Sequence, residues 1–241
     1  MEADRTDGPA LILTTKVLGI ELQLARSWLA GFVGTAAAYA WFAHALIPDV
    51  TFPVAVIHGA GVSVALTLSL LLHELAHARA AIEAGIGIEH IRIFAGGALV
   101  RRRDHIDEAR DQFKVAAAGP VTSAALGLSI LVVVVASDIA GWHSGLNVAL
   151  WFIAFANGLI AVSNMLPVFP FDGGKLVYAM FWHRTRDRQA ATTRLRQSGR
   201  EFSRIVLALG LITMAMTGQV LIGLVIAAFG WYLLRLPGPP D

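Results

Sequence analysis

Two histidines and a glutamate lie within five consecutive residues of a strongly apolar segment. His73, Glu74 and His77 form the pattern H-E-L-A-H inside residues 62–83. On an α-helix, residues four apart share a face, so the two imidazoles can bind one Zn²⁺. Hydrolytic zinc sites use three protein ligands and keep a fourth position for water, and Glu74 is then suited to be the general base. The pattern predicts metal-assisted hydrolysis of a peptide bond.

A chance match is the alternative interpretation of this pattern. The chain has eight histidines, and the pattern fixes only three positions. However, a charged side chain at the centre of a membrane helix costs about 2.5 to 3.5 kcal/mol on insertion scales. Three polar side chains so close together in an apolar segment therefore favour a functional role.

The third metal ligand is sought in a second unusual stretch, residues 164–175, which reads NMLPVFPFDGGK. Pro167 and Pro170 cannot continue a helix, and irregular backbone at membrane depth is found only inside protein or along a wet cavity. Asp172 in such a setting needs a cation, and we predict it as the third zinc ligand. The alternative is that Asp172 is the N-cap of a helix that begins at Gly173.

The overall composition is that of a membrane protein. Of 241 residues, 56% are hydrophobic and 15% are charged. The absence of cysteine leaves only histidine and carboxylate ligands for a metal. The net charge of +2 is explained better by membrane sidedness than by nucleic acid, so we expect no nucleic-acid partner.

We expect an all-α integral membrane protein of about six transmembrane helices, with a small β-hairpin or sheet at the membrane surface. One domain would occupy residues 1–241. The expected spans are about 27–47, 54–83, 113–136, 147–165, 203–217 and 219–236.

Three polar or mixed segments connect or precede these spans. Residues 11–25 alternate loosely, which predicts one or two short strands. Residues 85–104 predict a β-hairpin around Gly96 and Gly97, which is either a plain connection or a substrate-binding edge. Residues 183–204 are strongly basic, and we expect a solvated, partly helical loop there.

The distribution of basic residues predicts the orientation in the membrane. With six spans, all 19 Lys and Arg fall on one side or near its helix ends, and that side is cytoplasmic by the positive-inside rule. The termini and large loops would be cytoplasmic, in a multi-pass protein of the cell membrane. Residues 1–23 lack the features of a secretory signal, so we expect the first span to direct insertion.

Taken together, these motifs resemble the site-2 proteases, the intramembrane zinc metalloproteases. The resemblance runs from the GIELQL stretch at Gly19 through HELAH, the hairpin glycines and Ala118-Gly119-Pro120 to N-x-x-P-x-x-P-x-D-G at 164–173. It implies a six-helix core with one Zn²⁺ per chain, held by His73, His77 and Asp172, and Glu74 activating the water.

The resemblance also implies how a substrate would be held. The residue matching Asn164 lies near the site and helps hold the substrate or its developing oxyanion. The hairpin matching Phe94–Leu99, with Gly96 and Gly97, receives the substrate as an added strand. The expected partners are the lipid bilayer and a membrane-spanning protein or peptide, cleaved in regulated intramembrane proteolysis. We expect no PDZ domain between the spans and no CBS domain after them.

Two other functions fit the same residues. A metal-ion transporter could use the two histidines and two acids as a transit site, since polar residues within spans often line ion pathways. A pseudoprotease could bind membrane segments without cutting them.

Overall fold

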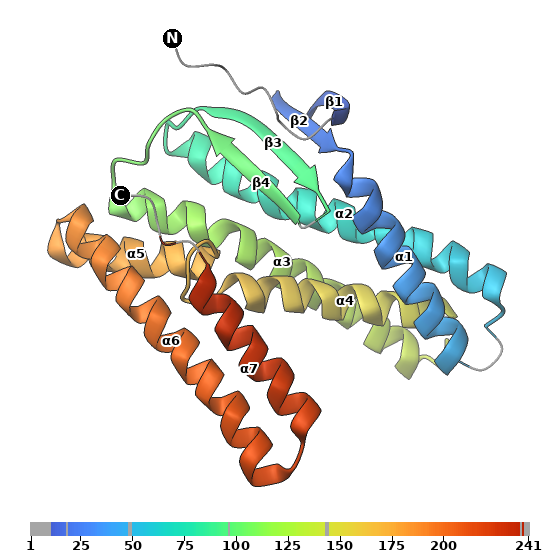
Figure 1. The fold of residues 1–241 in the computed structure, drawn as a ribbon. Coiled ribbons are helices and arrows are strands. Elements are labelled where there is room, and N and C mark those ends of the chain that lie inside the picture. The colour runs from blue at the N-terminus through green and yellow to red at the C-terminus, as the bar shows by residue number, and fades with distance from the viewer. Residues whose placement is uncertain are drawn as a thin grey trace. The chain divides into compact units, whose positions relative to one another are not determined.

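The computed structural model describes residues 11–17, 19–47, 50–95, 97–142, 145–236 and 238. It is mostly helical and contains one small sheet (Figure 1). The described residues belong to two compact units. The first draws on Met1–His105 and Val121–Ala161, and the second on Ile106–Pro120 and Val162–Asp241.

The sheet of the first unit has four strands in the order β1-β2-β3-β4. Antiparallel pairing joins β1 to β2 and β3 to β4, whereas β2 and β3 are parallel. Both predicted strand regions are thereby confirmed. The strands are β1 (Leu11–Val17), β2 (Ile20–Ala25), β3 (Ile88–Phe94) and β4 (Gly97–Arg102).

One face of the sheet is apolar because side chains alternate along each strand. Ile91 and Ile93 of β3 are 1% and 2% exposed, and both are on the same face. The sheet lies against α2 (Phe52–Glu83), as Figure 1 shows.

Helix α1 (Ser27–Leu46) packs closely against α2. A Cβ atom at Gly59 of α2 would overlap the carbonyl oxygen of Ala36, so only glycine permits this approach. Near this contact, Tyr39 and Val62 are almost fully buried in the apolar core. The remaining helical part of the first unit comes from residues 121–139 of α3 (Ala109–Ile139) and residues 145–161 of α4 (Gly145–Asn164).

The second unit contains α5 (Asp172–Thr185), α6 (Arg188–Thr217) and α7 (Val220–Arg235). Helix α6 begins far earlier than the predicted span at 203. The expected loop over 183–204 is therefore wrong over most of its length. Asp187 starts the helix, because its Oδ1 accepts the backbone N–H groups of Gln189 and Ala190 at 2.8 and 3.1 Å.

Three helices within the described residues are long and apolar enough to cross a membrane, namely α2, α3 and α4. Helix α7 is apolar but shorter. A mostly helical protein with candidate spans and a small sheet is thus confirmed. The remaining three spans and the single domain stay predictions.

Candidate metal centre

The two histidines of the HELAH pattern converge on one point. His73 and His77 lie on consecutive turns of α2, and their Nε2 atoms are 3.1 Å apart. Two ligand atoms placed 2.0 to 2.1 Å from a tetrahedral ion would be separated by about 3.3 Å. Both side chains are buried, with 3% and 8% exposed. The pair therefore has nearly the spacing that a single zinc ion requires.

A serine of α3 fixes the orientation of the first histidine. Nδ1 of His73 lies 2.9 Å from Oγ of Ser123, whose side chain is buried. If Nε2 binds a metal, the proton of the neutral ring is on Nδ1, which then donates to the serine hydroxyl. Histidine ligands of metals commonly donate their second ring nitrogen in this way. Sequence reasoning missed Ser123, because one serine in an apolar helix carries no motif.

A second buried polar contact lies one turn before His73. Asn157 of α4 donates through Nδ2 to Ser69 Oγ of α2 at 3.1 Å and to Ile153 O at 2.9 Å. Its Oδ1 atom has no hydrogen-bond partner among the described residues. These contacts tie α4 to the turn of α2 that precedes the histidines. Glu74 follows His73 directly and is also buried, with 9% exposed.

Asp172 is the first residue of α5 in the second unit and is 3% exposed. The N-cap of that helix is Phe171, so the alternative interpretation of Asp172 as the N-cap is wrong. Its Oδ1 accepts a charge-assisted hydrogen bond of 2.7 Å from Lys175 Nζ. The next residue, Gly173, permits a tight backbone packing, because a Cβ atom there would overlap the carbonyl oxygen of Met165.

The side chains of His73, His77 and Asp172 are all buried, and each offers one ligand atom for a metal. Two neutral imidazoles and one carboxylate are a common protein ligand set for catalytic zinc. Cysteine, which would favour a closed structural site, is absent from the chain. The donor set therefore fits zinc in a hydrolytic site.

The predicted substrate-binding residues lie on two elements. Asn164 is the last residue of α4 and is partly buried. Gly97 opens β4 with φ of +138°, a backbone conformation that side-chain-bearing residues rarely adopt. Gly96 lies outside the described residues. In the sheet, β4 is an outer strand, and its Leu99 side chain is 42% exposed.

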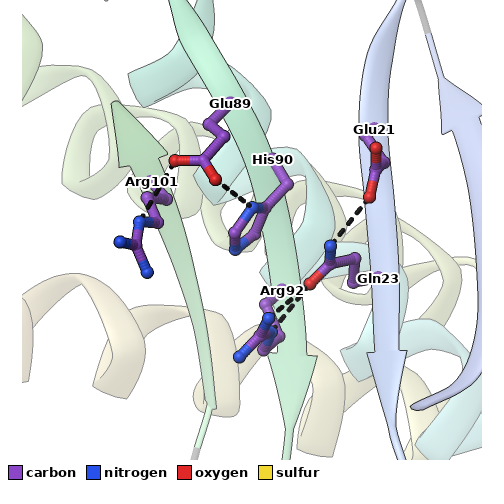
Figure 2. A network of polar contacts seen from close by, with 6 residues as sticks. All are labelled: Glu21, Gln23, Glu89, His90, Arg92 and Arg101. Carbon is purple, nitrogen blue, oxygen red and sulfur yellow. Dashed lines mark hydrogen bonds and ion pairs between the residues drawn. The ribbon is translucent and has the colours of Figure 1, made fainter. Parts of the chain in front are cut away.

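A polar network runs across this sheet (Figure 2). Arg92 of β3 donates twice to Gln23 Oε1 of β2, at 2.9 and 2.6 Å, and Gln23 in turn donates to Glu21 at 2.7 Å. On the other side of β3, Arg101 pairs with Glu89 at 3.1 Å. The network links β2 and β3 beyond their backbone pairing.

Comparison with known proteins identifies the family. The profile of peptidase family M50 matches residues 61–141 and 135–210, which contain both the histidine pair and Asp172. The chain belongs to peptidase family M50.

Curated relatives of this M50 protein include the putative zinc metalloprotease Rip3 of Mycobacterium tuberculosis. It is 35% identical over 178 residues, which cover 73% of this chain and 44% of Rip3. The putative zinc metalloprotease sll0528 of Synechocystis is 26% identical over 175 residues, covering 70% and 44%. The chain thus matches less than half the length of these relatives.

A solved structure shares the fold of this M50 protein. The site-2 protease from Methanocaldococcus jannaschii superimposes with a TM-score of 0.55 at 20% identity. The match covers 96% of this chain and 99% of that one. The resemblance to site-2 proteases is confirmed at the level of family and fold.

Proposed function

We propose that this M50 protein is an intramembrane zinc endopeptidase that cleaves membrane-spanning segments of other proteins. The observation that carries the proposal is the convergence of His73 and His77 Nε2 atoms, 3.1 Å apart, on a helix apolar enough to cross a membrane. The family membership and the names of the curated relatives support the same activity.

In this proposal His73, His77 and Asp172 would hold one zinc ion, and the bound ion would act as a Lewis acid that makes a water molecule easier to deprotonate. Glu74 takes a proton from the attacking water and returns it to the amine nitrogen as the peptide C–N bond breaks. Ser123 keeps the His73 ring in its ligand orientation, and Lys175 orients the Asp172 carboxylate.

Substrate positioning is assigned to Asn164 and to the hairpin of β3 and β4. The amide of Asn164 would donate to the developing oxyanion, where one donor contributes a few kcal/mol. The outer edge of β4 would accept the unwound substrate as an extra strand, and Gly96 and Gly97 would allow close backbone approach. Cleavage would fall near the cytoplasmic end of the substrate, as in regulated intramembrane proteolysis.

The decisive experiment compares Glu74→Gln with wild type in purified, detergent-solubilised protein. We expect about one zinc per chain in both, and a fall in substrate cleavage of about 10²- to 10⁴-fold in the variant, since only the base is lost. Glu83→Gln is the matched control. Glu83 is on the same helix, and its exposed carboxylate pairs only with Arg79 in the described contacts.

Three outcomes would overturn the proposal. The first is purified protein without zinc, and the second is a Glu74→Gln variant that cuts as fast as wild type. The third is a Glu74→Gln variant that changes zinc flux across vesicles while neither protein cuts a membrane substrate, and this result would support the transporter.

Substrate addition at β4 is tested by photocrosslinking. A benzoylphenylalanine at Leu99 of β4 should crosslink a single-span substrate, whereas the same group at Leu13 of β1 should not. Both positions are exposed and lie on outer strands of one sheet, so they differ chiefly in which edge they probe. Equal crosslinking at both would reject β4 as the docking edge.

A further inference from the structure

A hollow lies in the second unit, where the N-terminal half of α6 meets the C-terminal end of α7. Its volume is about 330 Å³. Leucines from both helices line it, together with two arginines of α6. The lining residues include Leu195, Arg196, Gly199, Arg200, Leu233 and Leu236.

The sequence around this hollow changes from charged to apolar. Residues 205–234 contain no charged side chain, and the helices that they form pack through glycines: a Cβ atom at Gly210 would overlap the backbone nitrogen of Ala227. Many large apolar side chains of this hairpin point outward, including Leu209, Ile212, Leu221, Val225 and Phe229. Such a surface is suited to lipid tails.

Aromatic and basic residues mark the level at which this apolar hairpin would leave the bilayer. Trp231 and Tyr232 are exposed near the end of α7, and the guanidinium of Arg235 lies 4.6 Å from the centre of the Trp231 ring. Tryptophan, tyrosine and snorkelling arginine concentrate at membrane interfaces. Since Leu233 and Leu236 line the hollow, it would then open at the level of the lipid headgroups.

Two arginines of α6 bring positive charge to the hollow. Arg196 and Arg200 are four residues apart on α6 and therefore share a face. Arg200 has no hydrogen bond or ion pair with any residue that the structure describes. A neighbouring hollow is lined by the same two arginines and Arg204, with Glu201 as its single acid. Each arginine can donate two parallel hydrogen bonds to a phosphate.

We propose that this hollow binds the phosphate of an anionic phospholipid headgroup. Arg196 and Arg200 hold the phosphate, and the leucine walls contact the glycerol backbone and the upper acyl chains. A free phosphate ion would gain nothing from these apolar walls, which is why the lipid is the favoured source. The inference rests on the proposed membrane placement of α6 and α7, but not on zinc binding or proteolysis.

The test uses the full chain in nanodiscs of equal parts phosphatidylglycerol and phosphatidylcholine, followed by native mass spectrometry of the lipids retained after extraction. Wild type should retain phosphatidylglycerol preferentially. Arg200→Gln should lower that preference about fivefold and the Arg196→Gln/Arg200→Gln double variant about thirtyfold, since one surface arginine contributes about 1 kcal/mol. Circular dichroism would check that the helices are intact.

Arg194→Gln is the matched control. Arg194 is exposed on the same helix and lines neither hollow. Its variant should retain the wild-type preference. An equal loss in Arg194→Gln would mean that general surface charge is responsible and would overturn the proposal. So would the absence of any preference in wild type.

A separate arm adds inorganic phosphate to protein in pure phosphatidylcholine nanodiscs. Binding of phosphate that depends on Arg196 and Arg200, without a preference for phosphatidylglycerol in the mixed nanodiscs, would show an ion site and overturn the lipid proposal. The Glu74→Gln variant should behave as wild type in every arm. The failure of this proposal is therefore distinguishable from the failure of the proposed proteolysis.

Discussion

Nδ1 of His73 and Oγ of Ser123 lie 2.9 Å apart, although 50 residues separate them in the chain. The contact joins α2 to α3 inside the first unit, and both side chains are buried. It fixes the ring that provides one proposed zinc ligand. The metal site therefore depends on a residue outside the HELAH pattern.

Replacing Ser123 by alanine should weaken zinc binding. The His73 ring would lose the partner that fixes its tautomer, and loss of such outer partners commonly lowers metal affinity about 10- to 100-fold. Competition with a fluorescent zinc chelator measures the change. Ser129→Ala is the control, since Ser129 is exposed on the same helix and, among the described residues, donates only to the backbone oxygen of Ala125. Equal affinity in both variants would show that the serine does not support the ligand.

Replacing His77 by alanine should abolish stabilisation by zinc. A ligand present at about 100 times its Kd stabilises the folded state by about 2.7 kcal/mol, and that increment should disappear with the ligand. Thermal unfolding with zinc and with a chelator measures it. His183→Ala serves as the control, because His183 is exposed near the end of α5. An undiminished zinc effect in His77→Ala would exclude His77 as a ligand.

The sequence was sufficient to predict α2 and the strands of the sheet, because the apolar run and the alternating segments have clear periods. It could not predict where α6 begins. The basic residues after Thr185 are typical of a solvated loop, yet Asp187 caps a helix that continues into the apolar segment. The basic residues indicated that this segment is exposed to solvent, but a solvent-exposed segment can be either a loop or a helix.

The supporting residues of the site were beyond sequence reasoning for a different reason. Ser123 and Asn157 acquire their roles only through contacts with α2 that span 50 and 88 residues. A local sequence pattern does not indicate a contact between residues so far apart in the chain. His73, Glu74, His77 and Asp172, by contrast, belong to motifs with a fixed spacing, although their roles as ligands and base stay predictions.

Replacing Arg92 by alanine should loosen β1 and β2 from the rest of the sheet. Arg92 makes two hydrogen bonds to Gln23 across the β2–β3 boundary (Figure 2), and such bonds contribute about 1.5 to 3 kcal/mol when one partner is charged. Hydrogen exchange of the β2 amides should become faster. Arg101→Ala, which removes only the exposed pair with Glu89, should leave β2 unchanged. Slow exchange of β2 in Arg92→Ala would reject the link.

Replacing Gly210 by alanine should destabilise the α6–α7 hairpin. The new Cβ atom would overlap the backbone nitrogen of Ala227 and lie 2.7 Å from its Cα, so the helices must separate. Overpacking of this kind typically costs about 1 to 3 kcal/mol. Thermal unfolding measures the loss. Gly158→Ala is the control, because a Cβ atom there meets nothing within 4 Å. A Gly210→Ala protein as stable as wild type would contradict the close packing.

Acidification should destabilise the sheet through His90. Burial lowers the pKa of His90 below its ordinary value of 6.5, and the charge of Arg92 lowers it further, while Glu89 partly opposes this; Arg101 and Glu21 contribute less. The unfolded chain therefore takes up the proton first as the pH falls. The contribution of His90 is fully present above pH 6.5 and is lost between that pH and the lower folded-state pKa.

Thermal unfolding of wild type and His90→Gln between about pH 8 and pH 5 tests this prediction. Wild type should lose more stability than the variant across the interval. Parallel curves for the two proteins would show that His90 does not contribute.

Because β2 pairs in parallel with β3, the amino-terminal strands cover an edge of β3 that would otherwise be exposed. If residues up to Ala25 were cut away, β3 would become an outer strand, and its unpaired backbone groups would flank the nearly buried side chains of Ile91 and Ile93. An uncovered apolar edge of this kind invites pairing with another chain. A shortened protein would thus have two exposed strand edges, β3 and β4, to which an extended peptide could add. Self-association through β3 would then compete with the binding of a peptide at β4.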